Sequence, residues 1–226
     1  MTALIVLRPE PGASATLASA RERGLDARAI PLFAIEPLPW VEPNPAAFDA
    51  LLLTSANAVR QGGDGLDRFC HLPAYAVGAA TAAAARARGF AIAATGTGGV
   101  RTLLGGMDPG LRLLHLCGED RRDPGNVPQT ITAIPVYRAR LVEPAPDVTT
   151  ATDSVVLVHS PRAAQRLVEL IERTGIARDR IAIAAVSAEA AAAAGNGWSA
   201  IAAADEPTDD ALLALAARLC NTTAPK

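Results

Sequence analysis

Two segments half a protein apart share one pattern, and this repeat constrains the fold more than any other feature of the chain. Residues 48–60 read FDALLLTSANAVR, and residues 152–164 read TDSVVLVHSPRAA. Each contains an aspartate, a short apolar run, a serine (Ser55 or Ser160) and then residues that start a helix. A short apolar run of this kind is typical of a buried parallel strand. The chain is therefore expected to build the same strand-to-helix turn twice.

The repeat continues beyond these two turns. Residues 74–104 and 181–213 each run from a strand through a turn of small residues into an alanine-rich helix. A glycine and an aromatic residue follow in both segments, and then another strand, a polar turn and a helix with two adjacent leucines. We therefore expect two related α/β halves.

Strands and helices alternate along the whole chain, which predicts parallel sheets flanked by helices. Strands are expected at 3–7, 30–36, 49–54, 73–77, 91–94, 111–116, 131–138, 154–159, 181–186 and 200–203. Helices are expected at 14–24, 56–61, 79–88, 98–105, 161–173, 187–194 and 208–219. In the first helix, Ser14 is the expected N-cap and Gly24 the expected stop.

The two halves need not be contiguous in sequence. Residues 30–39 and 133–144 are alike, because each is an extended Ile-Pro stretch with Glu-Pro at or near its end. A strand bounded by proline suits a sheet edge or a linker. If the two stretches pair antiparallel, the first strand and helix complete the sheet of the C-terminal half, and a ligand cleft between two domains follows. The expected organisation is one domain of 1–34 plus 144–226, a second of 40–132, and linker strands 35–39 and 133–143.

The composition excludes several classes of protein. Every basic residue is arginine except Lys226, so a Schiff-base lysine, a pyridoxal enzyme and a Walker-type phosphate loop are excluded. The formal net charge is −2, with acids and bases mixed along the chain, so no nucleic-acid partner is expected. The opening residues resemble neither a signal peptide nor a membrane span, and we expect no membrane association. Three cysteines without a C-x-x-C pair favour a reduced, cytoplasmic protein without structural zinc.

In parallel α/β sheets, ligands bind beyond the carboxyl ends of the strands, where helix N-termini present free N–H groups. The residues expected there are hydroxyls, glycines and arginines: Arg8, Thr54, Ser55, Gly78 to Thr81, Gly96 to Gly99, Gly118, Ser160 to Arg162, Ser187 and Thr208. Together they suit an anion that carries several carboxylates or phosphates. Alternatively, each serine or threonine simply caps its own helix, and the two roles are compatible.

Other candidate motifs give weaker evidence of function. His115 lies inside an apolar run and is expected in the core. His159 precedes Ser160, but adjacent strand residues point to opposite faces, which argues against a Ser–His dyad. Cys117 is either a nucleophile or, more commonly for its type, a buried thiol. The segment GEDRRD at 118–123 either clamps an anion or forms a solvated loop. No spacing typical of metal ligands is present.

Seven short segments together resemble the sequence of a known protein family. LRPEP, LLLTSANAVR, YAVGAATAAAARARGF, LHLCGEDRR, PVYR, VHSPRAA and EPTDDALL occur in this order over nearly the whole chain. In this order they resemble the uroporphyrinogen-III synthase family. The resemblance implies two flavodoxin-like α/β domains with parallel sheets, joined by a two-stranded antiparallel β linker. It also implies a cofactor-free enzyme of tetrapyrrole and heme biosynthesis, which we expect to be a monomer.

The family cyclises the linear tetrapyrrole hydroxymethylbilane, with loss of water and inversion of ring D through a spiro intermediate. This substrate bears eight carboxylates, which suits the hydroxyls, glycines and arginines at the strand ends. Tyr137 matches the tyrosine that the family offers as a proton donor, although it could equally be a tyrosine that packs the linker. Two alternatives are a non-catalytic tetrapyrrole-binding sensor of the same fold and a periplasmic-type solute-binding protein. The presence of Tyr137 favours the enzyme.

The resemblance also implies which residues hold the substrate: Arg8, Thr54, Ser55, Asn57, Gly78, Thr81, Gly118, Arg121, Arg122, Ser160 and Thr208. Of the two adjacent arginines, either matches the family's basic residue after Cys-Gly. The chain departs from the family at Ser187, where a glycine is common. It also departs at 124–134, where prolines interrupt the expected helix, so a loop is predicted there.

Overall fold

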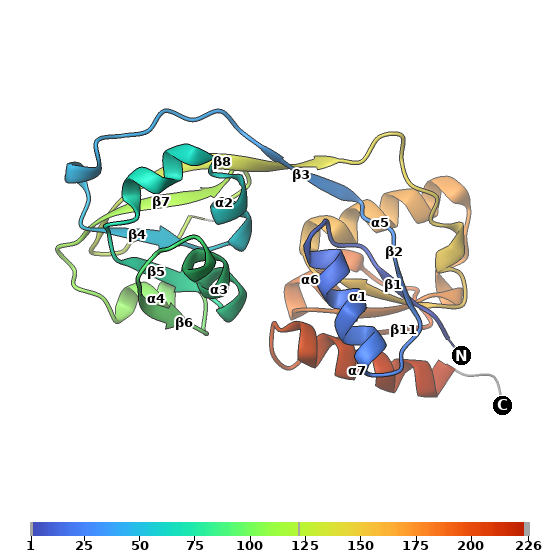
Figure 1. Ribbon diagram of the computed structural model, residues 1–226. Helices are drawn as coiled ribbons and strands as arrows, with labels where there is room; N and C mark the ends of the chain where they lie inside the picture. Colours follow the sequence, from blue (N-terminus) through green and yellow to red (C-terminus); the bar gives the residue numbers. More distant parts are fainter. Residues whose placement is uncertain (1, 122, 224–226) are drawn as a thin grey trace. The chain divides into compact units, whose positions relative to one another are not determined.

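A computed structural model describes residues 2–121 and 123–223 (Figure 1). Their contacts divide the chain into two compact units. One unit runs up to Ala34 and resumes at Leu141, and the other is the intervening segment Ile35–Arg140. The chain therefore leaves the first unit, completes the second and returns to the first.

The first unit is built on a five-stranded sheet with the strand order β11-β10-β9-β1-β2. All neighbouring strands in it pair in parallel. The strands are β1 (Leu4–Val6), β2 (Ala27–Ala29), β9 (Val155–Val158), β10 (Ala182–Ala185) and β11 (Ala200–Ala203). Because β1 lies between β2 and β9, the N-terminal strand occupies the interior of a sheet whose other half comes from the end of the chain.

Helices cover both faces of this sheet (Figure 1). They are α1 (Gly12–Glu22), α5 (Pro161–Thr174), α6 (Ala188–Ala194) and α7 (Asp209–Thr223), with short 3-10 turns η3 (Thr149–Ala151) and η4 (Arg178–Arg180). The core beneath α1 and α7 joins Leu4 and Leu157 of the sheet to Ala20 and Leu212 of the helices. The many alanines allow the helices to approach the sheet closely, which explains how a core with few aromatic residues packs densely.

The second unit is built on a six-stranded sheet with the order β3-β8-β7-β4-β5-β6. Its strands are β3 (Phe33–Pro37), β4 (Ala50–Leu53), β5 (Ala74–Val77), β6 (Ile92–Gly96), β7 (Arg112–Gly118) and β8 (Thr130–Leu141). The five strands from β4 to β8 pair in parallel. β3 is the edge neighbour of β8, where the Leu38 amide donates to Val136 O and the Val142 amide donates to Leu32 O.

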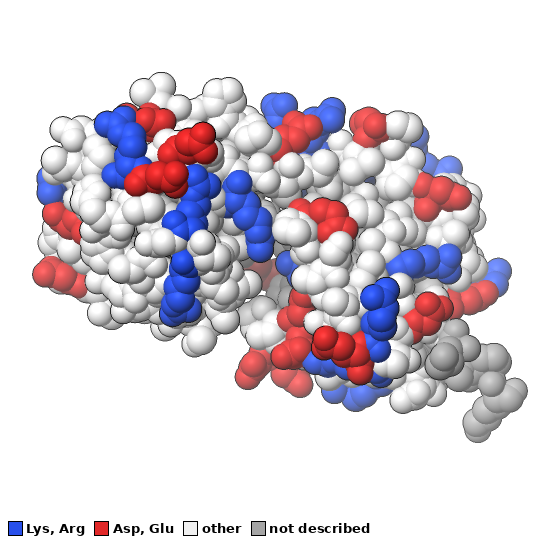
Figure 2. All heavy atoms as spheres, viewed as in Figure 1, with Lys and Arg blue, Asp and Glu red and all other residues white. Residues whose placement is uncertain are grey.

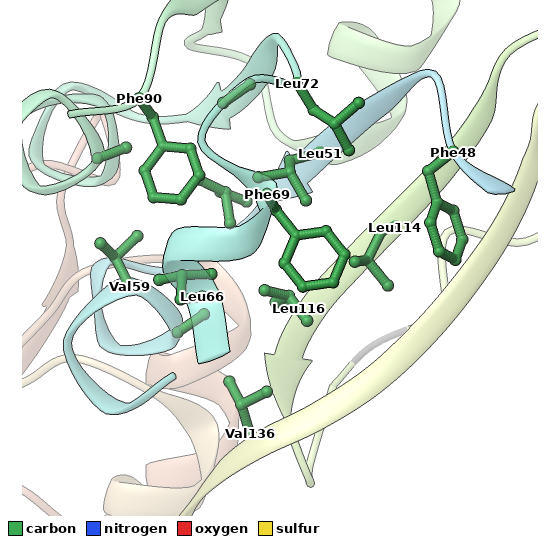
Figure 3. Close-up of a cluster of buried hydrophobic side chains, with 14 residues drawn as sticks. Phe48, Leu51, Val59, Leu66, Phe69, Leu72, Phe90, Leu114, Leu116 and Val136 are labelled. Atoms are coloured by element: carbon green, nitrogen blue, oxygen red, sulfur yellow. The ribbon is translucent and has the colours of Figure 1, made fainter. Parts of the chain in front are cut away.

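The two faces of this sheet have different covers. Leu51, Leu114 and Leu116 point to one face, where they pack against Val59 and Phe69 (Figure 3). That cover consists of α2 (Ala56–Gln61), η2 (Asp64–Phe69) and α3 (Ala79–Ala87), and η1 (Pro45–Ala47) precedes β4. The alternating residues of the strands point to the other face, where Leu103 and Leu104 of α4 (Val100–Gly105) cover them.

The crossover from β7 to β8 differs from the other parallel crossovers in this sheet. Parallel neighbours are usually joined through a helix that covers the sheet. Here residues 119–121 and 123–129, the described part of the connection, contain no helix. Pro124 and Pro128 interrupt this segment, and proline removes backbone donors that a helix requires. The loop predicted from these prolines is confirmed for residues 124–129, whereas residues 130–134 belong to β8.

Two sequence-based expectations at the N-terminal end are wrong. The helix expected from Ser14 begins at Gly12 after Pro11, and the Ser14 amide, inside the first turn, donates to Glu10 Oε2. The strand expected at 30–36 begins only at Phe33, as β3, and the chain before it forms a separate strand, β2, in the other sheet. Pro31 lies between them and lacks the N–H that a continuous ladder needs. β2 was missed because Arg28 interrupts its apolar pattern.

Candidate active site

Tyr137 of β8 lies beside Gly118, the last residue of β7. The register between these parallel strands shifts between Cys117 and Gly118, so that Cys117 pairs with Pro135 and Gly118 pairs with Tyr137. A Cβ atom at Gly118 would lie 2.8 Å from Tyr137 Cζ and 3.0 Å from its hydroxyl oxygen. Gly118 therefore provides the space that the phenol occupies.

The phenol of Tyr137 is partly buried and lies close to Ser55. Burial raises the pKa of Tyr137, and its hydrogen bond with the Ser55 side chain acts in the opposite direction. Since the net shift is upward from an ordinary value near 10, the phenol is protonated at neutral pH. Ser55 Oγ also accepts a hydrogen bond from the Asn57 amide at 3.2 Å and so caps α2. The phenol can therefore donate a proton, and the absence of a side chain at Gly118 gives it room.

Thr54, the residue before Ser55, contacts a buried histidine. Its Oγ1 lies 2.9 Å from Nε2 of His115, which is 2% exposed. Burial, together with the nearby positive charge of Arg121, lowers the pKa of His115 to about 4. The imidazole is therefore neutral at pH 7, and His115 is a core residue, as its apolar surroundings predicted.

The candidate residues of the second unit gather along one edge of its sheet. Tyr137 and Gly118 come from β8 and β7, Ser55 follows β4, and Gly78 follows β5, and these four strands are neighbours in this order. Gly78 starts α3 with a φ of +83°, a conformation that favours glycine. The N–H groups at the start of α3 are thereby presented at the same edge as the phenol.

Other residues that the resemblance implicates have additional partners in this unit. The Thr81 side chain is 5% exposed within α3, so its burial supports packing of that helix. Asn57 accepts a hydrogen bond of 3.4 Å from Arg60 through Oδ1. Arg121 interacts with the buried Cys117 thiol and lines a pocket with His115. Arg122 lies outside the described residues.

In the first unit, Arg8 follows β1 and is bound by an aspartate at the start of α7. Nη1 of Arg8 donates to both carboxylate oxygens of Asp209 at 2.8 Å, and Thr16 donates to Asp209 Oδ2 at 2.7 Å. Nε2 of the buried His159 lies 3.2 Å from Asp209 Oδ1. Burial alone would raise the pKa of Asp209, but contacts with His159, Thr16 and Arg8 lower it to about 2. Sequence reasoning missed this cluster because an aspartate in a first helical turn ordinarily serves the helix dipole.

Ser160 and Thr208 both cap helices in this unit. Ser160 Oγ accepts a hydrogen bond from the Ala163 amide at 3.1 Å and starts α5. Thr208 Oγ1 accepts one from the Ala211 amide at 3.2 Å in the first turn of α7. The capping interpretation is therefore correct for both residues. Each cap occupies one N–H group and leaves other N–H groups of the first turn available.

Two further properties concern the whole described chain. Among residues 2–121 and 123–223, no helix is long and apolar enough to cross a membrane. Nor do three or more His, Cys, Asp or Glu side chains come together as a potential metal site in these ranges.

The fold defines an α/β protein with two parallel-stranded sheets and with hydroxyl- and glycine-bearing turns at their strand ends. The chain belongs to the uroporphyrinogen-III synthase family, because the family model described as "Uroporphyrinogen-III synthase HemD" matches residues 14–214. No curated protein matches the sequence significantly.

Solved structures of this family share the fold. Uroporphyrinogen-III synthetase from Helicobacter pylori has a TM-score of 0.63 and 18% identity, with 97% of this chain and 100% of that chain covered. A mutant uroporphyrinogen III synthase from the extremely thermophilic bacterium Thermus thermophilus has a TM-score of 0.54 and 18% identity, with 97% and 99% covered. At this identity the likeness concerns the fold alone.

Membership of the family assigns the chain to porphyrin and heme biosynthesis as an enzyme of the lyase type. The reaction of this family is the cyclisation of hydroxymethylbilane, a linear tetrapyrrole. The family match and the structural neighbours do not favour the alternative of a non-catalytic tetrapyrrole sensor. The recognition drawn from the ordered sequence segments is confirmed.

Proposed function

We propose that this chain forms uroporphyrinogen III with Tyr137 as the proton donor at the carboxyl edge of the six-stranded sheet. The observation that carries this assignment is the placement of the phenol. It is protonated, lies close to Ser55 and is accommodated by the absence of a side chain at Gly118. A donor fixed in this way can deliver a proton to one oxygen atom of a bound substrate.

The first chemical step is loss of the substrate's hydroxyl group. As the C–O bond breaks, the Tyr137 phenol gives its proton to the departing oxygen, and water leaves. The remaining electrophile is an azafulvene, whose positive character is spread over the pyrrole. Ring D attacks it through its substituted carbon and forms the spiro intermediate, which fragments and closes again with ring D reversed. Loss of a proton from the ring carbon restores the pyrrole and balances the proton donated first.

Most of the rate enhancement in this proposal comes from positioning. A flexible linear tetrapyrrole closes at its unsubstituted end unless its rings are held, so fixing the carboxylates selects the product. The proposed contacts in the second unit are Thr54, Ser55, Asn57, Gly78, Thr81, Gly118 and Arg121, together with Arg122. In the first unit they are Arg8, Ser160 and Thr208. The N-termini of α3, α5 and α7 support this assignment, because free N–H groups there bind anions.

We also propose the two-domain, flavodoxin-like organisation with an antiparallel linker. The proposed domains are 1–34 plus 144–226 and 40–132, with 35–39 and 133–143 as linker strands. Support comes from two hydrogen bonds in this region: Leu38 N–H to Val136 O between the linker strands, and Val142 N–H to Leu32 O just before the first of them. Along one strand these positions ascend while along the other they descend, as in antiparallel pairing.

The proposed setting is a monomer in the cytoplasm that acts on a small molecule and binds neither nucleic acid nor membranes. Three free cysteines support a reducing compartment. Basic and acidic side chains are intermixed over the face shown in Figure 2, in agreement with the formal net charge of −2. A mixed surface of this kind is a poor match for a polyanion.

A product assay tests the proposal. The purified chain is mixed with freshly prepared hydroxymethylbilane, and the type I and type III isomers of uroporphyrinogen are separated. The expected result is predominant type III, whereas buffer alone gives type I. If the chain also gives only type I, at the rate of buffer, the enzymatic assignment is wrong. If wild type gives type III and Tyr137→Phe gives it equally fast, only the assignment of the proton donor is wrong.

A further inference from the structure

The second unit contains a pocket under the helix-free crossover between β7 and β8. Its volume is about 230 Å³, below the roughly 300–1,000 Å³ of sites for drug-sized ligands. The lining combines the strand residues His115, Ile131 and Ala133 with the crossover residues Arg121 and Gln129. It therefore has room for a molecule of about the size of an amino acid.

The missing helix explains why a pocket exists here. Leu113 and Ile131 belong to the apolar face of the sheet that α4 covers, and α4 lies beside β6 and β5 rather than β8. In the other crossovers a helix packs onto the strands it connects. Between β7 and β8 the proline-containing loop takes that place, and it leaves space above His115 and Ala133.

One buried polar group in this lining lacks a partner. Gln129 is 5% exposed, and its Nε2 donates to Leu104 O at 3.0 Å, with Met107 O and Asp108 O at 3.4 and 3.3 Å. These three carbonyls fix the orientation of the amide. Gln129 Oε1 then has no hydrogen-bond partner among the described residues. A buried acceptor in this state is costly, and a donor placed in the pocket would relieve the cost.

The charged groups of the lining are on the loop. Arg121 supplies a guanidinium, and Arg101 of α4 approaches the loop, since a Cβ atom at Gly125 would lie 3.2 Å from its Nη1. Asp123 supplies the opposite charge, but its Oδ1 already accepts the Gly125 amide at 2.8 Å. The floor of the pocket is the buried imidazole of His115. The guanidinium groups of Arg121 and Arg101 lie near one carboxylate, Asp123, which already accepts a hydrogen bond. The opening of the pocket therefore favours an anionic group of a ligand.

We propose that this pocket binds a small organic anion whose carboxylate pairs with Arg121 and whose N–H donates to Gln129 Oε1. The pocket lies on the other face of the sheet from Tyr137, which packs with the opposite core, and Arg121, which is also proposed to contact the tetrapyrrole, is the residue that the two places share. A contact that links the two places is Thr54 Oγ1 to His115 Nε2 at 2.9 Å. The proposal does not depend on the chemistry assigned to Tyr137.

Three small probes separate the two recognition elements. N-acetylglycine carries both a carboxylate and an amide N–H, acetate carries only the first, and N-methylacetamide carries only the second. Each is titrated into the isotopically labelled full chain while the NMR signals of His115, Gln129 and Ala133 are followed. N-acetylglycine should bind with a Kd of about 1 mM, and the other two at least about tenfold more weakly.

Variants assign the binding to the pocket. Arg121→Gln should weaken N-acetylglycine about tenfold, and the exposed Arg86→Gln on α3 is its control, with unchanged binding. Ala133→Leu fills the pocket from β8 and should abolish the shifts. Gln129→Met should bind N-acetylglycine no better than acetate. The proposal is overturned if no shifts occur, if acetate binds as tightly as N-acetylglycine, or if Ala133→Leu binds like wild type. Because this assay involves no turnover, it is independent of the proposed function.

Discussion

Nη1 of Arg8 donates to both carboxylate oxygens of Asp209, each at 2.8 Å, and so joins the end of β1 to the start of α7. The two residues lie near opposite ends of the sequence, but both belong to the first unit. Their side chains are 32% and 31% exposed, so the pair is partly shielded from water. Asp209 therefore holds in place an arginine that is itself proposed to contact substrate.

Replacing Asp209 by asparagine should destabilise the first unit. The change removes the charge that Arg8, Thr16 and His159 contact, and hydrogen bonds to charged groups contribute about 1.5–3 kcal/mol. We expect the free energy of unfolding to fall by about that amount in urea denaturation. Asp210→Asn is the matched control: its side chain is 84% exposed, and a change within about 0.5 kcal/mol is expected. Equal losses in the two variants would contradict the role of Asp209.

Tyr137→Phe separates chemistry from binding. The substitution removes the phenolic hydroxyl group, and with it the interaction with Ser55, but keeps the ring. If the phenol protonates the departing oxygen, kcat should fall about 10²-fold while KM stays nearly constant. Tyr75→Phe on β5 is the control and should retain full kcat. Single-turnover rates with hydroxymethylbilane measure the effect, and an unchanged rate in Tyr137→Phe would leave positioning as the source of catalysis.

Gly118→Ala should displace the phenol without unfolding the unit. The new methyl group would lie 2.8 Å from Tyr137 Cζ, so the ring must move. Overpacking of this kind typically costs about 1–3 kcal/mol, and the activity should fall towards that of Tyr137→Phe. Gly105→Ala in α4 is the control, because a Cβ atom there meets no atom within 4 Å. The prediction fails if Gly118→Ala keeps wild-type kcat and stability.

Thr208 has two assigned roles that two substitutions distinguish. Thr208→Val removes the oxygen that accepts the Ala211 amide and should cost about 1 kcal/mol of stability as well as weakening substrate binding. Thr208→Ser keeps an oxygen at that position and should retain the cap. Denaturation and product-affinity measurements on both variants provide the comparison. Wild-type affinity in Thr208→Val would show that the hydroxyl only caps α7.

The neutral imidazole of His115 should make stability depend on pH. Its pKa is about 4 in the folded chain against an ordinary value of 6.5, so between these values only the unfolded chain binds the proton. The contribution is therefore fully present above pH 6.5 and is lost as the pH falls towards about 4. Burial also lowers the pKa of His159, which acts in the same direction.

Urea midpoints at about pH 7.5 and about pH 5 measure this dependence. The decrease should be smaller in His115→Gln than in wild type, because one of the two buried histidines is gone. His71→Gln is the control, since His71 is exposed, and its decrease should match that of wild type. A steeper decrease in His115→Gln than in wild type would contradict the assignment.

The local structure around the repeated turns followed from the sequence. An apolar run that ends at a serine predicted β4 and β9, and in both cases the serine caps the next helix. These features depend on nearest neighbours along the chain, which a sequence displays directly. Proline interruption of 124–134 predicted the missing helix for the same reason, because proline acts on its own backbone.

The long-range residue pairs that build the site could not be predicted from the sequence in the same way. Gly118 meets Tyr137 only because the register between β7 and β8 shifts near Pro135, and a shift of one residue exchanges the faces of a strand. Asp209 meets Arg8 only once α7 has packed onto β9 and β10 and against α1. The unpartnered oxygen of Gln129 depends on three carbonyls after α4. Such contacts are set by tertiary packing rather than by local pattern.

The interior position of β1 has a consequence for folding during synthesis on the ribosome. Its partner β9 begins at Val155, so during synthesis β1 emerges long before half of its sheet exists. The segment Ile35–Arg140 contains the strands of its own core and is complete when β9 is still untranslated. Vectorial folding should therefore finish the inner unit first, while the apolar Leu4–Val6 segment awaits its neighbour and needs protection from other nascent chains.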